Sequence, residues 1–164
     1  MRRLAAIGLL LVALAARAEV PLPASVSAPE WRAVGSGSLN WLMLRVYDAT
    51  LWRSAAGDAL AIRYARDLSG RQLLDATFDE MTHLNVAGAA RWRAALAEIF
   101  PDVRAGEVLV AVRHPAQGVR FFHQGRALGA IDAPAFGAAF FAIWLDPRTR
   151  APALRSRLLG GVAP

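Results

Sequence analysis

The hydrophobic pattern along this chain changes its period three times, and that succession restricts the fold more than any single motif does. Apolar residues follow the period of β-strands over residues 31–65, although imperfectly over 39–53, where both faces carry them. They recur at helical spacing over 69–100, alternate again over 107–131, and return to helical spacing over 134–159. Helices therefore follow groups of strands instead of alternating with single strands. This order predicts an α+β fold with a large antiparallel sheet.

Individual elements follow from the same pattern. The predicted strands are 31–37, 39–53, 58–65, 107–114, 118–124 and 126–131, and the predicted helices are 69–84, 87–100, 134–145 and 152–159. Ser69 is expected to cap the first helix, and Pro101 ends the second. Gln124 and Gly125 predict a tight hairpin turn. We find no internal repeat and expect one domain.

The first 18 residues have the three parts of a secretory signal peptide. Arg2 and Arg3 form a positive start, residues 4–16 are almost uniformly apolar, and Ala16 and Ala18 place small side chains before a cleavage site. An uncleaved N-terminal anchor is the alternative, but the apolar run is shorter than the roughly 20 residues that span a bilayer. We therefore expect cleavage after Ala18 and a periplasmic or secreted protein.

Removal of the signal changes the charge balance of the remaining chain. The whole sequence has 19 arginines and lysines against 13 acids, and three of the arginines precede residue 19, so the net charge falls from +6 to +3. Runs of like charge never exceed two residues, so neither a nucleic-acid partner nor a polybasic membrane patch is expected. No later segment is apolar enough to span a membrane. Residues 19–30, with three prolines, are expected to form an extended leader to a domain at 31–160.

Conventional catalytic and metal-binding motifs are not found in this sequence. The lack of cysteine excludes a disulfide framework, a zinc finger and a thiol nucleophile. His83, His114 and His123 have no metal-ligand spacing, although the last two are placed to face each other across the predicted meander. No serine lies in a nucleophile elbow. The glycines at 35 and 37 run into a strand, so we interpret them as a bulge or tight turn. We expect no catalytic residue, no metal and no cofactor.

Arg45 and Tyr47 form the most distinctive polar pair in an apolar setting. In a single strand at 39–53 they point to one face, together with Trp41 and Met43. Helices packed on that face would enclose a cation and a phenol in an apolar cleft. A buried arginine needs an anionic partner, which is either a protein carboxylate or the carboxylate of an apolar ligand. We predict Arg45, Tyr47, Trp41 and Met43 as ligand-binding residues.

Segments along nearly the whole chain resemble the chalcone isomerase-like superfamily. Residues 46–52, Val-Tyr-Asp-Ala-Thr-Leu-Trp, resemble a characteristic strand of that superfamily. Further segments match in order and spacing: FPDVRAGE at 100–107, PxxGVxFF at 115–122, GxxxGxI at 125–131, the aromatic stretch 136–141, IWLDPRT at 143–149 and the close at 154–160. From about residue 31 to 160 the chain is similar to the exported bacterial branch of the family.

The resemblance implies an antiparallel sheet with helices on one face, short strands on the other and a ligand cleft between sheet and helices. Plant members cyclise chalcones to flavanones without a cofactor, and other members bind fatty acids. The isomerase pattern is incomplete, because residues 35–38 lack its arginine and Ala142 stands where a hydroxyl is expected. Tyr47 replaces the isomerases' threonine, as in the fatty-acid-binding branch. The resemblance implies that Tyr47 contacts ligand.

These observations leave three functions open. The first is an exported, non-catalytic protein that binds a small apolar ligand such as a fatty acid. The second is a cofactor-independent isomerase or lyase, in which Arg45 stabilises an oxyanion and Tyr47 transfers a proton. The third is an accessory protein that binds another exported protein through an exposed aromatic surface. A long apolar tunnel favours the first, a compact polar cleft the second and a filled cleft the third.

Overall fold

The computed structural model describes residues 19–26 and 30–161. Its sheet has the strand order β1-β2-β3-β4-β5-β6, and every neighbouring pair is antiparallel. The strands are β1 (Arg32–Trp41), β2 (Leu44–Ser54), β3 (Gly57–Tyr64), β4 (Val108–His114), β5 (Gly118–His123) and β6 (Arg126–Ile131). The helices are α1 (Gly70–His83), the 3-10 turn η1 (Ala89–Trp92), α2 (Arg93–Ile99), α3 (Pro134–Leu145) and α4 (Pro152–Leu158). The predicted α+β class is confirmed.

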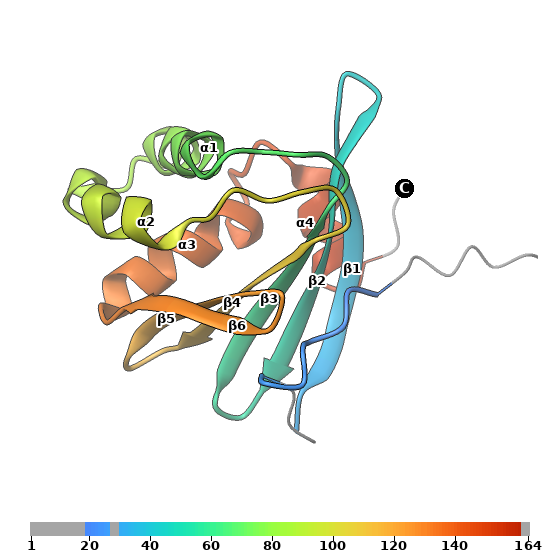
Figure 1. Cartoon of the computed structure of the whole chain (residues 1–164), viewed down its shortest axis with the longest axis horizontal. Helices are drawn as coiled ribbons and strands as arrows, with labels where there is room; N and C mark the ends of the chain where they lie inside the picture. The colour runs from blue at the N-terminus through green and yellow to red at the C-terminus, as the bar shows by residue number, and fades with distance from the viewer. Residues whose placement is uncertain (1–18, 27–29, 162–164) are drawn as a thin grey trace, which may run out of the picture.

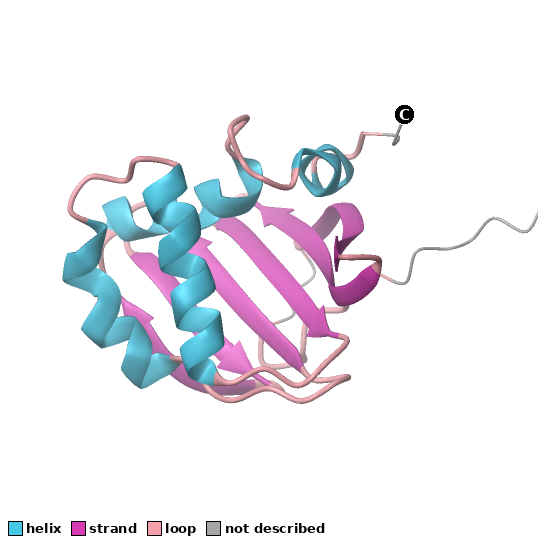
Figure 2. Cartoon of the chain, turned by 90° about the horizontal axis from the view of Figure 1, so that it is seen from above, coloured by secondary structure: helices cyan, strands magenta, loops and turns pink. Residues whose placement is uncertain are grey.

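The helices cover one face of the sheet (Figure 1). α3 contacts β4 and β5, α2 contacts β6, and α1 packs on α2 and α3. α4 packs against β1 and β2 and also contacts α3, and it is seen end-on in the view from above (Figure 2). Within the described ranges, no helix has the length and apolarity that crossing a membrane requires.

The main core lies between the sheet and the helices, and aromatic rings fill its centre. Phe121 of β5 and Phe136 and Phe141 of α3 are almost completely buried. The rings of Phe121 and Phe140 meet edge to face with centroids 5.3 Å apart. Aromatic pairs in this geometry gain about 0.5–1.5 kcal/mol beyond their burial. These contacts fix α3 on the sheet.

The helix boundaries show how local signals decide where each helix begins. Ser69 caps α1 as predicted, since its side chain accepts from the Gln72 N–H while the Gln72 side chain accepts from the Ser69 N–H. The helix predicted at 87–100 is shorter, because Gly88 is left-handed and only a 3-10 turn precedes α2. The predicted helix at 134–145 is confirmed, with Pro134 in its first turn.

Leu42 and Met43 form the turn between β1 and β2, so the single strand predicted at 39–53 is wrong. Both residues have positive φ, 47° and 66°, as the central pair of a type I′ hairpin turn requires. Such turns favour asparagine and glycine, neither of which stands at these positions. The hairpin extends beyond the helix layer at the top of Figure 1. The turn predicted at Gln124 and Gly125 is confirmed, with φ of 50° and 78°.

Gly35 and Gly37 lie within β1, not in a turn, and they let α4 approach the strand. A Cβ on Gly35 would lie 2.0 Å from the backbone oxygen of Arg157. A Cβ on Gly37 would lie 2.9 Å from Leu154 Cδ1. The pairing register shifts between Ala33 and Gly35, which agrees with the predicted bulge.

The leader covers the second face of the sheet. Val20 is fully buried, its N–H donates to Thr50 Oγ1 at 2.8 Å, and its carbonyl accepts from Trp52 Nε1 at 3.1 Å. Val20 packs with small apolar residues of β3 and β4. In the described residues the leader therefore occupies the face where the resemblance implies short strands.

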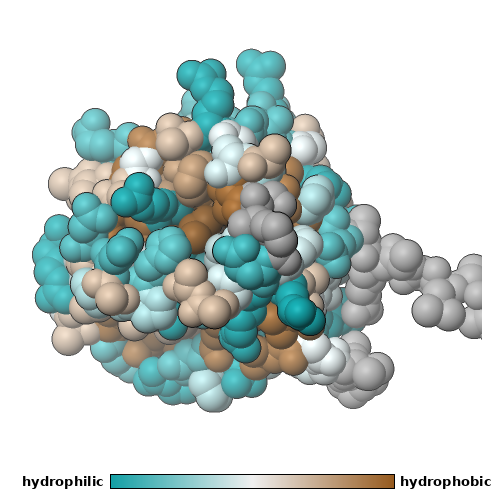
Figure 3. Space-filling view, turned by 90° about the horizontal axis from the view of Figure 1, so that it is seen from below, coloured by the Kyte–Doolittle hydropathy of each residue, from teal (hydrophilic) through white to brown (hydrophobic). Residues whose placement is uncertain are grey.

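Seen from below, the surface is largely hydrophilic around an apolar centre (Figure 3). The predicted signal peptide, residues 1–18, lies outside the described residues.

Candidate functional site

The four predicted ligand-binding residues do not share one cleft. Leu39 pairs with Tyr47 and Asn40 with Arg45, so Val46 is an extra residue in β2. Such a bulge interrupts the alternation of side chains between the two faces. The Arg45 guanidinium consequently reaches Asp48 Oδ2 at 3.4 Å, and 60% of the arginine side chain is exposed. The prediction that Arg45 lies in an enclosed cleft beside Tyr47 is wrong.

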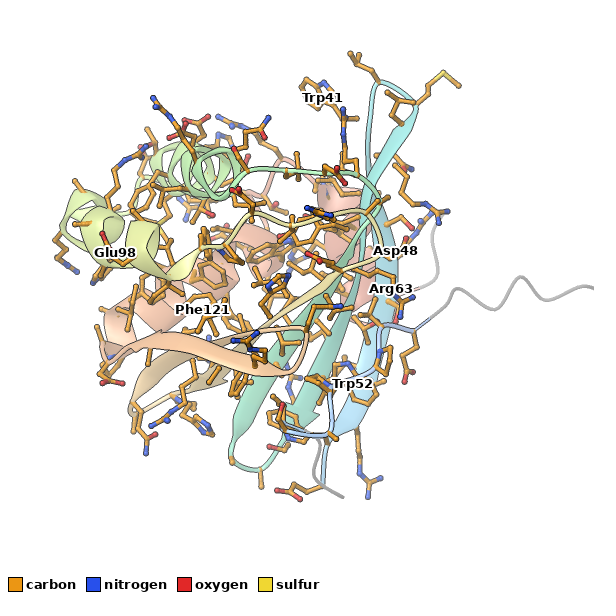
Figure 4. The ribbon with its side chains drawn as sticks, viewed as in Figure 1. Trp41, Asp48, Trp52, Arg63, Glu98 and Phe121 are labelled. Carbon is orange, nitrogen blue, oxygen red and sulfur yellow. The ribbon has the colours of Figure 1, made fainter. Side chains whose placement is uncertain are left out.

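Trp41 and Met43 lie at the end of the β1–β2 hairpin. Their exposed fractions are 69% and 99%. Figure 4 shows Trp41 near this end, well away from Phe121 in the core. Met43 belongs to the turn itself, where the backbone reverses instead of continuing the predicted strand, and its side chain is therefore in solvent. Their expected position in a covered cleft is therefore also wrong.

Tyr47 does face the helix layer, as predicted, and it lies among residues that sequence analysis did not single out. Its phenol oxygen accepts a hydrogen bond of 2.9 Å from Trp144 Nε1 of α3. Its ring meets the ring of Tyr64, on β3, edge to face at a centroid distance of 6.0 Å. The two tyrosines are register partners on adjacent strands. We call Tyr47, Tyr64 and Trp144 the two-tyrosine site.

Glu80 of α1 places a negative charge close enough to affect the pKa of Tyr47. Its Oε1 accepts from Arg150 Nη1 at 3.0 Å, whereas its Oε2 is buried without a hydrogen-bond partner among the described residues. Burial raises the pKa of Tyr47 to about 12, with Glu80 adding to the rise and the Trp144 hydrogen bond opposing it. Burial, and next the charge on Tyr47, also raise the pKa of Tyr64. Both phenols are therefore neutral hydrogen-bond donors near pH 7.

Two phenolic protons are available at this site. Among the described residues, the Tyr47 hydroxyl is hydrogen-bonded only as the acceptor from Trp144, and the Tyr64 hydroxyl makes no hydrogen bond. Side chains otherwise fill the space between sheet and helices here, with the rings of Phe140 and Trp144 5.2 Å apart. Each phenol can therefore donate one hydrogen bond from beside an apolar interior. A neutral phenol with a raised pKa is a poor general base.

A surface hollow of about 440 Å³ lies elsewhere, beside α1 and α2. Its charged rim is internally paired, because Asp75 contacts both Arg71 and Arg93. Asp102 accepts from the Gly70 N–H at 2.8 Å. The hollow does not lie between the sheet and the helices, and its charges are already compensated.

The three histidines do not gather. His123 Nε2 lies 2.8 Å from Glu107 Oε2. The hydrogen bond from the Arg104 N–H, and next the one with His123, lower the pKa of Glu107. His114 pairs with Gly118 at the far end of β4 from His123, so these two do not face each other as expected. Across 19–26 and 30–161, no three His, Asp or Glu residues form a cluster suited to a metal ion.

The comparison with family models matches residues 35–160 to the chalcone isomerase-like model. The chain belongs to the chalcone isomerase-like family. Among solved structures it is similar to a fatty-acid binding protein from Arabidopsis thaliana, with a TM-score of 0.65 and 13% identity, over 84% of this chain and 90% of that chain. None of the curated proteins compared matches this sequence significantly. The chalcone isomerase-like fold expected from the resemblance is confirmed.

Within this family fold, sequence reasoning identified Tyr47 but missed Tyr64, Trp144 and Glu80. Tyr64 was placed on the correct strand, and its alternation with Leu60 and Ile62 signals that it faces the same side. Trp144 and Glu80 come from α3 and α1, and the way these helices pack on the sheet and on each other has no local signal. Their meeting depends on which strands each helix covers.

Proposed function

We propose that the protein binds a small amphipathic molecule, such as a fatty acid, at the two-tyrosine site without chemical turnover. The observation that carries this proposal is a pair of phenolic protons, beside an aromatic interior, that no described residue accepts. An apolar molecule with one acceptor oxygen matches that arrangement, with its oxygen on the phenols and its tail among the rings. The fold similarity to a protein whose title describes fatty-acid binding supports the same ligand class.

Ligand entry requires side chains to separate, because rings fill the site in this structure. Tyr47 is only half-buried, and Trp144 is held to it by a single hydrogen bond. These two side chains are the ones a tail would displace. Their rearrangement would release the Trp144 N–H, which then becomes a third donor for the ligand oxygen.

The isomerase alternative loses its geometric basis. It needs the Arg45 guanidinium beside the Tyr47 hydroxyl, and the bulge at Val46 separates them. The raised pKa of Tyr47 also disfavours a phenolate base at neutral pH. We therefore expect no enzyme-dependent loss of chalcone absorbance. Turnover proportional to protein concentration and abolished by Tyr47→Phe would restore the isomerase.

Titration with a fluorescent fatty acid tests the binding proposal. Wild type should bind saturably, and Tyr47→Phe should bind roughly three- to tenfold more weakly, since a neutral hydrogen bond contributes about 0.5–1.5 kcal/mol. Arg45→Met is the matched control, because Arg45 pairs with Asp48 away from the site, and it should bind like wild type. Absence of saturable binding, or equal affinity in wild type and Tyr47→Phe, would reject the site.

A second candidate function is binding of a partner through an exposed apolar surface. The filled interior between sheet and helices favours this function, because a protein that binds another protein needs no ligand cleft. The specific observation in its support is the exposed apolar end of the β1–β2 hairpin, residues 41–44.

We also propose that the protein acts outside the cytoplasm, beginning at Glu19. The three-part N-terminus supports export, and Glu19 is exposed where the leader begins. Val20, one residue later, is anchored on Thr50, so a new terminus at Glu19 leaves the leader in place. N-terminal sequencing of the protein from a periplasmic or culture fraction should read Glu19 first. An intact Met1 in the membrane fraction would contradict export with cleavage.

A further inference from the structure

The end of the β1–β2 hairpin exposes four large apolar side chains in succession. Trp41, Leu42, Met43 and Leu44 are 69%, 81%, 99% and 61% exposed. We call these four residues the hairpin tip. Elsewhere in the described chain, Leu159 is the one further large apolar residue with comparable exposure, at 41%. A contiguous apolar group of this kind marks an interaction surface.

The turn itself is unfavourable both in backbone and in solvation. Leu42 and Met43 have positive φ, a conformation that side chains other than glycine, asparagine and aspartate adopt at a cost. Asn-Gly would form the same turn without strain and without apolar exposure. The Gln124–Gly125 turn shows that the chain uses a polar residue and glycine where only a reversal is needed. Leucine and methionine at the tip therefore have a role beyond making the turn.

The shape of the tip favours a lipid bilayer over a rigid protein surface as its partner. The hairpin projects beyond the body of the molecule (Figure 1), and the four exposed side chains of the tip lie at its narrow end. A rigid protein surface contacts one side of such a projection, and stable protein pairs bury roughly 800 Å² on each partner. The acyl and headgroup boundary of a membrane surrounds a projection on every side. Tryptophan is also enriched at that boundary.

Charges beside the tip are compatible with a membrane surface. No acidic residue occurs between Leu39 and Tyr47. Arg45 follows the tip directly, with an exposed guanidinium whose partner is Asp48 at 3.4 Å. Arginine can keep its aliphatic stem at an apolar boundary and place its charge on a phosphate. The proposed mature chain carries a net charge of +3, which attracts it to anionic lipid.

We propose that the hairpin tip inserts into the headgroup boundary of an anionic lipid bilayer, with Arg45 on lipid phosphate, as a reversible peripheral anchor. This inference goes beyond ligand binding and does not depend on it. The tip and the two-tyrosine site carry different residues, so each can be removed without the other.

Flotation with lipid vesicles tests the anchor. The protein is used in the form in which it is purified from its own cells, after any processing of the N-terminus. The vesicles contain phosphatidylglycerol and phosphatidylethanolamine, with pure phosphatidylcholine for comparison. The key variant combines Leu42→Asn with Met43→Gly, because Asn-Gly keeps the hairpin and removes its apolar side chains. Leu159→Asn is the matched control, since it removes an exposed leucine away from the tip. Arg45→Gln tests the charge.

Wild type should float with the anionic vesicles, and the Asn-Gly variant should partition roughly ten- to a hundredfold more weakly. Leu159→Asn should behave like wild type. Arg45→Gln should lose about fivefold on anionic vesicles and nothing on phosphatidylcholine. Equal flotation of wild type and the Asn-Gly variant would overturn the proposal. The proposal would also be overturned if the wild-type protein bound neither type of vesicle, whether it remained a monomer or self-associated through the tip.

Discussion

The indole N–H of Trp144 donates a hydrogen bond of 2.9 Å to the phenol oxygen of Tyr47. This bond joins α3 to β2, elements 97 residues apart in the chain. Because the Tyr47 oxygen is used as an acceptor, its proton is free to point elsewhere. The bond therefore both holds the helix layer on the sheet and orients the group that we propose to meet a ligand.

A double-mutant cycle should show that these two residues are coupled. Tyr47→Phe leaves the largely buried Trp144 N–H without a partner, which should cost about 1–3 kcal/mol of unfolding free energy. Trp144→Phe removes the donor and some volume. In the double variant no unpaired donor remains, so the two losses should fall short of additivity by about 1 kcal/mol. Urea unfolding measures each variant.

Trp92→Phe provides the control for that cycle. Trp92 packs edge to face on Phe136, at 5.3 Å, on the η1 side of the core. The loss of unfolding free energy caused by Trp92→Phe should add to the loss caused by Tyr47→Phe. Strict additivity in the Tyr47–Trp144 cycle would show that the hydrogen bond contributes nothing to stability.

Sequence periodicity predicted most of the fold because most elements have local causes. Ser69 with Gln72 begins α1, Pro134 begins α3, and Gln124 with Gly125 turns the last hairpin. Each feature acts within a few residues of where it occurs. The meander and the helix order follow from such signals alone.

The β1–β2 hairpin could not be predicted by the same means. Its turn residues, Leu42 and Met43, continue the apolar pattern of the flanking strands, so they read as strand. The bulge at Val46 has no sequence signal either, and it reverses the face on which Arg45 lies. One missed turn and one missed bulge were enough to assemble a binding site from residues that the fold separates. Tyr47 was correctly oriented because it lies on the regular side of the bulge.

Close packing of α4 on β1 predicts unequal effects for two alanine substitutions. In Gly35→Ala the new Cβ would meet the backbone oxygen of Arg157 at 2.0 Å, so the helix must move. This should lower the unfolding free energy by at least about 1–3 kcal/mol. In Gly37→Ala the Cβ meets the end of the Leu154 side chain at 2.9 Å, which can rotate, so the loss should be smaller. Equal losses in thermal or urea unfolding would contradict this packing.

The leader should contribute to stability through Thr50. Its hydroxyl accepts from the buried Val20 N–H and shares a 2.7 Å hydrogen bond with Ser36. Thr50→Val should cost about 1–3 kcal/mol and expose residues 19–26 to proteases. Ser25→Ala is the control, because its bond to the Gly125 carbonyl is exposed, and it should cost under about 0.5 kcal/mol. A leader that resists proteolysis equally in both variants would show that Thr50 does not anchor it.

The two tyrosines should make stability fall steeply in alkali. Tyr47 and Tyr64 are the only tyrosines in the chain, and burial raises the pKa of both, that of Tyr47 to about 12. Above pH 10 the unfolded chain loses phenolic protons that the folded protein keeps. The unfolding free energy is therefore unaffected below pH 10 and falls above it by about 1.4 kcal/mol per pH unit for each phenol, until the folded protein also ionises.

Near-ultraviolet absorbance should show little phenolate at pH 11 in the folded protein and full ionisation in urea. Tyr47→Phe should halve the slope of unfolding free energy against pH. A phenolate transition centred near pH 10 in the folded protein would mean that neither phenol is buried as described.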